Sequence, residues 1–363
     1  MDKNKPYDIE LLDKRDSRIE IKDFLPQLMR TYSKLQVYKV KLNDSKLDHR
    51  LFLPVLQTKE ALSSSILEGT QATLEDVLEE RLEEKSHSDE VVEIFNCYQA
   101  IAYGAAYLQT NRITEEMLHE LHKILMDGKV HKDSNIVGGF RNSQNYVKNR
   151  KTGQVTYTPP APEMISKSMQ NLFSYMDVQC PDYYELIRVA IIHAQFETIH
   201  PYYDGNGRVG RILIPLYLYY KKVIDSPFFF ISDAFETNRV KYYKLLMNLR
   251  EMADWNNWIS YFLETMEMQC DKYIKVVDEI NRLYEKDLNR ILEKIRADKA
   301  KALIELLFQY PVVNANTIMK NLDIQRNTAK RYLEILEMEG ILYSDGKERY
   351  IRYYYNELLQ LLM

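Results

Sequence analysis

The sequence predicts a mainly α-helical protein with a small α+β unit at its C-terminal end. The first observation is helical periodicity, since apolar residues recur at spacings of three and four in residues 92–108, 114–127, 163–177 and 183–199. The second is a pair of short β-capable runs on either side of Lys151-Thr152-Gly153, which are interpreted as a hairpin. The length of 363 residues suits two or three domains with well-formed cores.

The first segment with a motif is a helix-compatible run that ends near Gly69. Within it, Ser64 and Glu68 are four residues apart and therefore share one face of a helix. Gly69 follows directly, and glycine is the residue that most often ends a helix. Taken alone this pattern is weak, because a solvated glutamate is far commoner than a functional one.

The helix expected at residues 114–127 has a recognisable start. Thr114 is a candidate N-cap, and the two glutamates after it place negative charge in the first turn. The hairpin expected next includes Gln144, Asn145, Tyr146, Val147 and Lys148. An ordinary connecting loop is the alternative interpretation of this stretch.

The most informative segment runs from His200 to Arg211 and reads HPYYDGNGRVGR. Its three glycines allow a tight turn whose N–H groups can face an anion. The apolar run after Arg211 predicts a buried helix, which would accommodate Pro215 only with a kink or an early end. A glycine-rich turn at the start of a helix predicts a phosphate-binding loop.

The charged residues of this segment suit nucleotide chemistry. Arg208 and Arg211 offer forked donors that match phosphate oxygens. His200 can accept a proton near neutral pH, and Asp204 can hold Mg²⁺ against phosphate. A surface turn with solvated arginines and a core histidine explains each residue singly, but it does not explain the whole string.

This string resembles the signature of the Fic family, in which His-Pro-Phe, a variable residue, Asp or Glu, Gly-Asn-Gly-Arg and a second Arg form the active loop. Tyr202 stands where the family usually has Phe, an aromatic exchange that should still pack. The resemblance extends over much of residues 60–265. It implies a Fic-type helical core and transfer of AMP from ATP, with Mg²⁺, to a Ser, Thr or Tyr hydroxyl of a target protein.

The resemblance also implies roles for individual residues. His200 would be the general base and Asp204 the metal ligand. The expected nucleotide-binding residues are Gly205, Asn206, Gly207, Arg208, Val209, Gly210, Arg211, Tyr242 and Tyr243. Gly207 favours AMP transfer, because the phosphate-transferring Doc-type relatives carry Lys at this position. The paired tyrosines are otherwise more typical of a core, and Arg250 stands where some relatives have an adenine-contacting Asn.

By the same resemblance, the hairpin at residues 144–148 is a flap that holds the main chain of the target by β-augmentation. Ser64, Glu68 and Gly69 match the family's inhibitory helix motif, in the class whose inhibitor lies in the same chain. Glu68 would then pair with Arg211 and occupy the site of the γ-phosphate of ATP. ATP would still enter, but in an unproductive pose.

The C-terminal part begins with a highly charged helix after Met266. Beyond it, three short helical segments and two β-capable runs resemble a winged helix-turn-helix. Arg326, Lys330 and Arg331 could face DNA, but neighbouring acidic residues nearly cancel their charge. We therefore favour a protein-interaction or dimerisation role, including a homodimer, over DNA binding.

Four regions are thus expected along the chain. They are an N-terminal helical region with the inhibitory motif, a Fic catalytic core, a connecting helix and a winged-helix-like domain, at residues 1–110, 111–265, 266–300 and 301–363. The net charge of −4 gives no overall signature of nucleic-acid or membrane binding. No apolar run is long enough for a membrane span, the N-terminus lacks a secretory signal, and three scattered cysteines fit reduced thiols, so a cytoplasmic protein is expected.

Two other functions stay open. One is a transcription regulator or adaptor whose Fic-like core only senses a nucleotide, although sensing does not require the general base His200. The other is the removal of AMP from modified proteins, with Glu68 orienting a water molecule. AMP transfer is the leading function, and we expect the chain itself to be among its target proteins.

Overall fold

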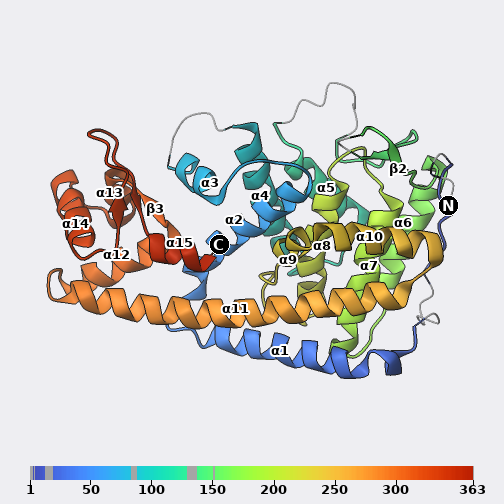
Figure 1. Ribbon diagram of the computed structural model, residues 1–363, viewed down its shortest axis with the longest axis horizontal. Coiled ribbons are helices and arrows are strands. Elements are labelled where there is room, and N and C mark those ends of the chain that lie inside the picture. The colour runs from blue at the N-terminus through green and yellow to red at the C-terminus, as the bar shows by residue number, and fades with distance from the viewer. Residues whose placement is uncertain are drawn as a thin grey trace.

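The computed structural model describes residues 3, 5–12, 19–82, 88–128, 137–149 and 152–362. In this part of the chain fifteen α-helices and five short strands are present, as the mainly helical prediction required. Figure 1 shows an elongated molecule with the long helix α11 (Trp255–Leu292) along its length. No helix within these ranges is long and apolar enough to cross a membrane.

Two buried helices form the centre of the larger part of the molecule. Helix α7 (Glu185–Ile199) is buried at every position, and α8 (Asn206–Tyr220) packs against it. The helices around this pair are α2 (His49–Leu67), α4 (Asp89–Tyr107), α5 (Glu115–Leu125), α6 (Pro162–Met176) and α10 (Arg239–Met252). Shorter pieces complete it, namely η1 (Ile21–Asp23), α3 (Leu74–Glu80), η2 (Asp182–Tyr184) and α9 (Ser232–Thr237).

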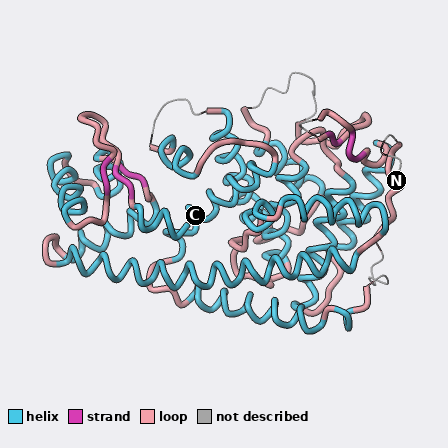
Figure 2. Tube along the Cα trace, viewed as in Figure 1, coloured by secondary structure: helices cyan, strands magenta, loops and turns pink. Residues whose placement is uncertain are grey.

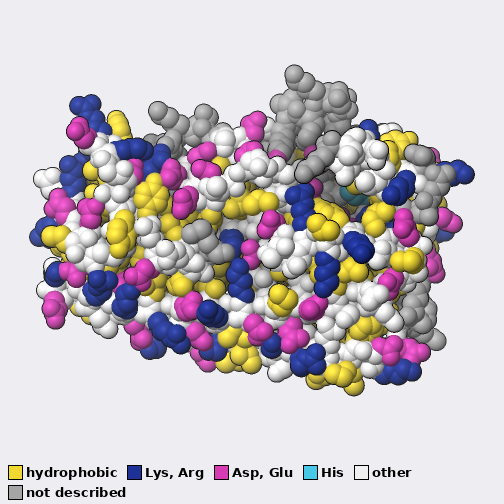
Figure 3. Space-filling view, in the orientation of Figure 1, with side chains coloured by type: hydrophobic (Ala, Val, Ile, Leu, Met, Phe, Trp, Pro, Cys, Tyr) yellow, Lys and Arg dark blue, Asp and Glu magenta, His cyan; other side chains and the backbone are white. Residues whose placement is uncertain are grey.

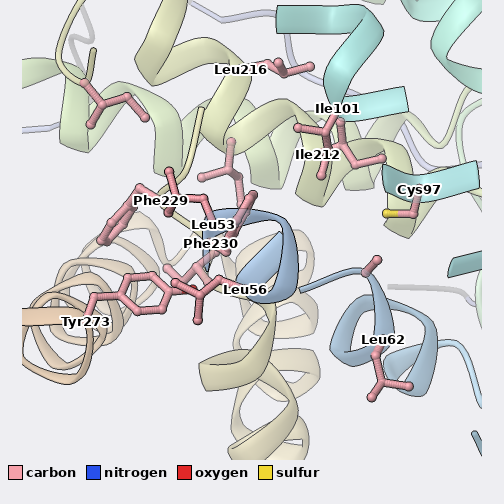
Figure 4. Close-up of a cluster of buried hydrophobic side chains, with 14 of the residues drawn as sticks. Leu53, Leu56, Leu62, Cys97, Ile101, Ile212, Leu216, Phe229, Phe230 and Tyr273 are labelled. Atoms are coloured by element: carbon pink, nitrogen blue, oxygen red, sulfur yellow. The ribbon is translucent and has the colours of Figure 1, made fainter. Parts of the chain in front are cut away.

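The hydrophobic core joins segments that are far apart in the sequence. Figure 4 shows Leu53 and Leu56 of α2 close to Phe229, Phe230 and Tyr273. Helices α4 and α8 approach closely at Gly104, where a Cβ atom would lie 2.5 Å from the side chain of Leu216. Helix α2 is therefore held by the core along most of its length.

Helix ends follow the predicted local signals in two places and depart from them in one. Thr114 caps α5, because its hydroxyl accepts a hydrogen bond from the Met117 N–H at 3.2 Å. Helix α2 ends at Leu67, and Gly69 adopts a φ of 101°. Helix α8 continues through Pro215 to Tyr220, so the early end was wrong; packing on α4 and α7 outweighs the missing backbone donor.

Helices α1 (Leu25–Asn43) and α11 pack along each other. Ion pairs join them at Lys34–Asp271 (2.6 Å) and Lys41–Asp278 (2.5 Å). Side chains of both signs mix along this edge in Figure 3. The helix expected from Met266 begins at Trp255 instead, because its first turns are apolar and buried and do not share the charged pattern of the rest.

The predicted hairpin is confirmed. Strands β1 (Val147–Lys148) and β2 (Val155–Tyr157) pair in antiparallel fashion. Beyond β2, the Tyr7 N–H donates to the Thr158 carbonyl at 3.0 Å, so the N-terminal segment lies on that side of the hairpin. Strand β1 pairs with no other described strand.

The C-terminal unit contains the three predicted helices, α12 (Ala297–Gln309), α13 (Ala315–Leu322) and α14 (Arg326–Met338). Figure 2 shows strands in two separate places, and the strands of the C-terminal unit lie apart from the hairpin of β1 and β2. The strand order is β3-β5-β4. The two β-capable runs were expected at residues 339–343 and 350–354. Strand β4 (Tyr343–Ser344) instead begins at the last residue of the first run and extends into the expected turn, and β5 (Tyr353–Tyr354) keeps the end of the second run. Strand β3 (Val312–Val313) and helix α15 (Asn356–Leu362) were not predicted. The winged helix-turn-helix assignment stays a prediction.

The C-terminal unit contacts the helices that carry and follow the Ser64–Gly69 motif. Helices α12 and α15 both pack against α2. On α3, Glu79 pairs with Arg352 and accepts a hydrogen bond from the Tyr354 hydroxyl at 2.5 Å. The guanidinium of Arg81 lies 4.6 Å from the ring centre of Tyr310. The unit is therefore attached to the core through more than the long helix α11.

Candidate active site

His200 lies at the junction between α7 and the glycine loop. Its backbone is left-handed, with φ 51° and ψ 60°, and its N–H donates to the Phe196 carbonyl at 2.9 Å. A non-glycine residue in this conformation costs roughly 1–2 kcal/mol, so surrounding contacts must hold it there. The chain reverses at this residue and enters the loop that leads to α8.

The environment of His200 keeps its imidazole neutral. Burial, together with the positive charges of Arg250 and Arg141, lowers the pKa of His200 to about 4. At pH 7 the ring is therefore unprotonated and can accept a proton. Arg250 donates to the Glu197 carbonyl at 2.9 Å and stacks over Tyr157 at 4.0 Å, so it supports the end of α7.

The loop after His200 is closed by its own side chains. Asn206 accepts from the Tyr202 N–H and donates to the Tyr202 carbonyl, each at 2.8 Å. Gly205 has a φ of 75° and precedes the first turn of α8. The first N–H groups of a helix have no partner within it, so this turn presents donors suited to an anion. The Asn206 side chain itself closes the loop.

Arg208 lies inside the molecule. It is buried, and its guanidinium faces Glu93 of α4 at 3.3 Å and the sulfur of Met126 at 3.7 Å. It therefore lies among the helices beneath the loop, and its predicted phosphate contact stays a prediction. The physical reason is its position on α8, whose buried side at this point meets α4.

Asp204 has the accessibility that a metal ligand needs. Its side chain is 53% exposed, one oxygen accepts from the Gly205 N–H at 2.6 Å, and the other lies 3.9 Å from Arg208 Nη2. Among the described residues no group of three or more His, Cys, Asp or Glu side chains could hold a metal ion. A single carboxylate fits Mg²⁺, which commonly takes its other ligands from phosphates and water.

Arg211 meets the upstream motif directly. Its Nη2 atom lies 2.8 Å from Glu68 Oε1 and 2.9 Å from the Ser64 carbonyl, and its Nε donates to the Ser64 hydroxyl at 2.8 Å. Arg211 is 1% exposed, and Glu68 is 31% exposed. Burial is the largest single influence and disfavours the charge of Arg211, but Glu68, Tyr242, Tyr243 and Glu197 together outweigh it and raise the pKa of Arg211. The predicted Glu68–Arg211 pair is present.

Helix α2 is also held at its end from α10. The Leu67 carbonyl accepts from Arg239 Nη2 at 2.8 Å and from the Tyr243 hydroxyl at 3.3 Å. Gly207 accommodates the neighbouring carboxylate, because a Cβ atom there would lie 2.2 Å from Glu68 Oε1. The Glu68 carboxylate thus lies against the start of α8.

Three of the predicted nucleotide-binding residues are packed inside the molecule, and their nucleotide contacts stay predictions. Val209 is fully buried, and Gly210 lies against Glu197, whose Oε1 would be 2.4 Å from an added Cβ. Tyr242 is buried, and its hydroxyl lies 2.9 Å from His193 Nε2. Tyr243 is different, since it is 39% exposed and can present a ring face to a ligand. The core interpretation of the tyrosine pair therefore holds for Tyr242 alone.

The hairpin lies next to the loop. Asn145 donates to the Tyr203 carbonyl at 2.9 Å, and Gln144 donates to the Pro159 carbonyl at 2.9 Å. The Tyr203 hydroxyl accepts from the Ser143 N–H at 3.1 Å. Tyr146 is exposed, and Val147 and Lys148 form β1. Of the predicted flap residues, Asn145 therefore contacts the His200 loop directly, and Tyr146, Val147 and Lys148 continue from it into the hairpin.

Sequence analysis missed two histidines of α5. His119 Nδ1 lies 3.2 Å from the Tyr202 hydroxyl, which gives the unusual tyrosine a polar partner. His122 stacks on Tyr202, with ring centres 4.0 Å apart, and its Nε2 lies 3.1 Å from the Asp204 carbonyl. Burial lowers the pKa of His122 to about 4, so it is neutral. Their three-residue spacing on one helix was the available signal.

Comparison with known proteins assigns the family. Residues 112–218 match the Fic/DOC family, and residues 33–106 match the Fic/DOC family N-terminal region. A probable protein adenylyltransferase of Aquifex aeolicus is 25% identical over 207 residues, which cover 56% of this chain and 58% of the relative. Protein adenylyltransferase Fic of Drosophila erecta is 27% identical over 223 residues, 59% of this chain and 41% of the relative. The chain spans about half the length of these curated relatives.

Solved structures share the fold. A Fic family protein from Desulfovibrio desulfuricans G20 has a TM-score of 0.59 at 18% identity and covers 92% of this chain and 95% of its own. A Fic domain containing signaling protein from Bacteroides thetaiotaomicron has a TM-score of 0.53 at 20% identity, with coverage of 69% and 97%. These structures show the fold alone. The matches of residues 33–106 and 112–218 show that the chain belongs to the Fic/DOC family.

Proposed function

We propose that this chain is a protein adenylyltransferase, which transfers AMP from ATP to a Ser, Thr or Tyr hydroxyl of a target protein. The observation that carries this proposal is the neutral His200 beside the glycine loop at the start of α8. The names of the relatives in Aquifex aeolicus and Drosophila erecta support the same reaction. A site that only senses a nucleotide would need no unprotonated base beside its phosphates.

The proposed reaction follows from the groups at the loop. His200 takes the proton of the target hydroxyl while the hydroxyl oxygen bonds to the α-phosphorus of ATP. The bond from the α-phosphorus to the bridging oxygen breaks, and pyrophosphate leaves. The N–H groups of Asn206 and Gly207 bind phosphate oxygens, and Arg211 holds the γ-phosphate once Glu68 has moved. Tyr243 offers its exposed ring to the adenine.

Asp204 would hold Mg²⁺ at this site together with phosphate oxygens. Its half-exposed carboxylate beside the loop supports that role. The ion would supply charge neutralisation on the phosphates. Asp204 itself orients the loop, because it accepts the Gly205 N–H at 2.6 Å.

The flap would position the target. The main chain of the target adds to the edge of β1, since the N-terminal segment already lies beyond β2. The exposed Tyr146 provides a surface for the neighbouring side chain. Exposed hydroxyl groups of the chain itself are targets of the same chemistry, so self-modification in a homodimer belongs to this proposal.

Glu68 would inhibit the transfer. Its carboxylate pairs with Arg211 at 2.8 Å and lies where the γ-phosphate must bind. ATP would then bind with its phosphates in an unproductive position. The removal of AMP, with Glu68 orienting a water molecule, uses the same partly exposed carboxylate and is the second candidate.

The test uses the purified chain with Mg²⁺-ATP, a cell lysate as the source of targets, and mass spectrometry for the added AMP mass. We expect modified Ser, Thr or Tyr residues on a target protein or on the chain, and none with His200→Ala. A modified protein that instead loses AMP in the absence of ATP would select the second candidate. Nucleotide binding without either reaction would support the sensing alternative.

We also propose that the protein is located in the cytoplasm. Its three free cysteines, two of them buried, suit the reducing conditions there.

A further inference from the structure

We infer that Arg141 is a positioning residue that fixes the backbone of His200 and joins it mechanically to the flap. Because this role concerns the reaction at His200, it rests on the proposed function. Arg141 is 2% exposed, and its Nε donates to the His200 carbonyl at 2.9 Å. Its backbone N–H donates to the Pro201 carbonyl, also at 2.9 Å. One residue therefore holds two successive carbonyls at the point where the chain reverses.

The rest of the guanidinium reaches both ends of the hairpin. Arg141 Nη1 donates to the Ser143 carbonyl at 3.1 Å, and Nη2 donates to the Pro160 carbonyl at 2.6 Å. Ser143 precedes β1, and Pro160 follows β2. A single planar group thus ties the loop of His200 to the entrance and the exit of the flap.

The side chain is suited to this role and to little else. No carboxylate of the described residues lies within ion-pair distance of Arg141, and burial lowers its pKa. Its charge is balanced by backbone carbonyls, which a guanidinium can bind in three directions at once. An apolar side chain would fill a purely structural site at a lower desolvation cost. Lysine has a single ammonium group, which cannot reach all three carbonyls that the guanidinium of Arg141 contacts.

The contact matters because His200 has a left-handed backbone. Without the side-chain bond to the His200 carbonyl, this turn can relax toward a more common conformation, and the imidazole moves with it, even though the backbone bond to Pro201 remains. A misplacement of about 1 Å can reduce a reaction rate about 100-fold. A target chain that adds to β1 also pulls on Ser143 and Pro160, so Arg141 transmits the presence of the target to the base.

The first experiment compares Arg141→Lys with Arg188→Lys. Arg188 is a matched control, since it is equally buried and donates to the Tyr175 carbonyl, but it lies near the start of α7, away from the loop. For Arg141→Lys we expect kcat for AMP transfer to fall about 100-fold and the KM for the target to rise, while the KM for ATP stays within about twofold. For Arg188→Lys we expect a lower Tm with little change in kcat. Equal kcat losses in the two variants would reduce the effect to general destabilisation and overturn the role.

Two further measurements separate positioning from bulk stability. Added guanidinium ion, at concentrations well below those that unfold proteins, should restore part of the activity of Arg141→Ala and none of that of His200→Ala. Ring resonances of His200 in labelled protein should shift in Arg141→Lys and stay in place in Arg188→Lys. Unchanged His200 resonances with wild-type kcat would refute the inference. If the wild-type chain transfers no AMP, the proposed function fails, while the resonances still decide whether Arg141 positions His200.

Discussion

Replacing Glu68 with glycine should increase AMP transfer. Glu68 Oε1 accepts a hydrogen bond from Arg211 Nη2 at 2.8 Å, and Arg211 is almost fully buried. Arg211 keeps both of its bonds to Ser64 after the substitution, so it stays in place with a free edge toward the loop. In the proposed mechanism that edge becomes available to the γ-phosphate of ATP. A charge removed from a purely structural helix end would instead lower the activity or leave it unchanged.

The contact sets the size of the effect. A hydrogen bond between charged groups stabilises by roughly 1.5–3 kcal/mol. Glu68 is 31% exposed, so solvent weakens the interaction and the lower value applies. About 1.5 kcal/mol corresponds to about a tenfold preference for the inhibited arrangement, and hence about a tenfold gain in rate when it is removed.

The assay is incorporation of labelled AMP into the target and into the chain itself at saturating Mg²⁺-ATP. Glu68→Gln should give a smaller gain, because an amide can still accept from Arg211 but carries no charge. The double change Glu68→Gly with Arg211→Ala should erase the gain, since the freed phosphate ligand is missing. Glu75→Gln is the control, because Glu75 is an exposed glutamate on α3 that lies outside the motif. This substitution should leave the rate of AMP transfer unchanged. A Glu68→Gly variant no more active than the wild type, on any target or on itself, would show that the inhibitory role is wrong.

Four other predictions follow from the site. His200→Ala should lower AMP transfer about 10²–10⁴-fold, with ATP affinity by calorimetry little changed; a near-wild-type rate would mean that another group takes the proton. Because the pKa of His200 is lowered to about 4, its base form persists well below pH 6.5, so kcat/KM should fall only as the pH drops toward 4; an acid limb near 6.5 contradicts this. Asp204→Ala should weaken Mg²⁺-dependent turnover more than ATP binding measured without metal, whereas equal losses would make Asp204 a structural turn residue. The full chain should bind DNA weakly and in a salt-sensitive manner by fluorescence anisotropy, and a tight, sequence-selective complex at physiological salt would revive the regulator alternative.

Short-range patterns account for what the sequence predicted. The Thr114 cap, the end of α2 before Gly69 and the hairpin depend on residues within a few positions of each other. The pair formed by Glu68 and Arg211 is a long-range contact, across 143 positions. It was predicted through the family resemblance, since neither residue shows from its own neighbours which partner it meets.

The contacts that the sequence did not predict depend on which face of a helix is buried. Val209 and Arg208 follow each other on α8, and both turn toward neighbouring helices, whereas a motif names residues without their direction. Arg141 and His122 contact the loop across 59 and 82 positions. Even where a local pattern exists, as in the three-residue spacing of His119 and His122, it does not name the partner, because backbone carbonyls belong to every residue.

Gly207 connects the proposed reaction with the proposed inhibition. In the first turn of α8 it leaves its N–H open to an anion, and its missing side chain leaves room for the Glu68 carboxylate, which would lie 2.2 Å from a Cβ atom. Any larger residue would displace that carboxylate from its bond with Arg211 Nη2, and the added Cβ atom would also lie 2.8 Å from Arg211 Nη1. A lysine there, as in the Doc-type relatives, could not coexist with Glu68 in its present position. Gly207, at which the resemblance predicts AMP transfer, is therefore also the residue that leaves room for Glu68, the proposed inhibitor, beside Arg211.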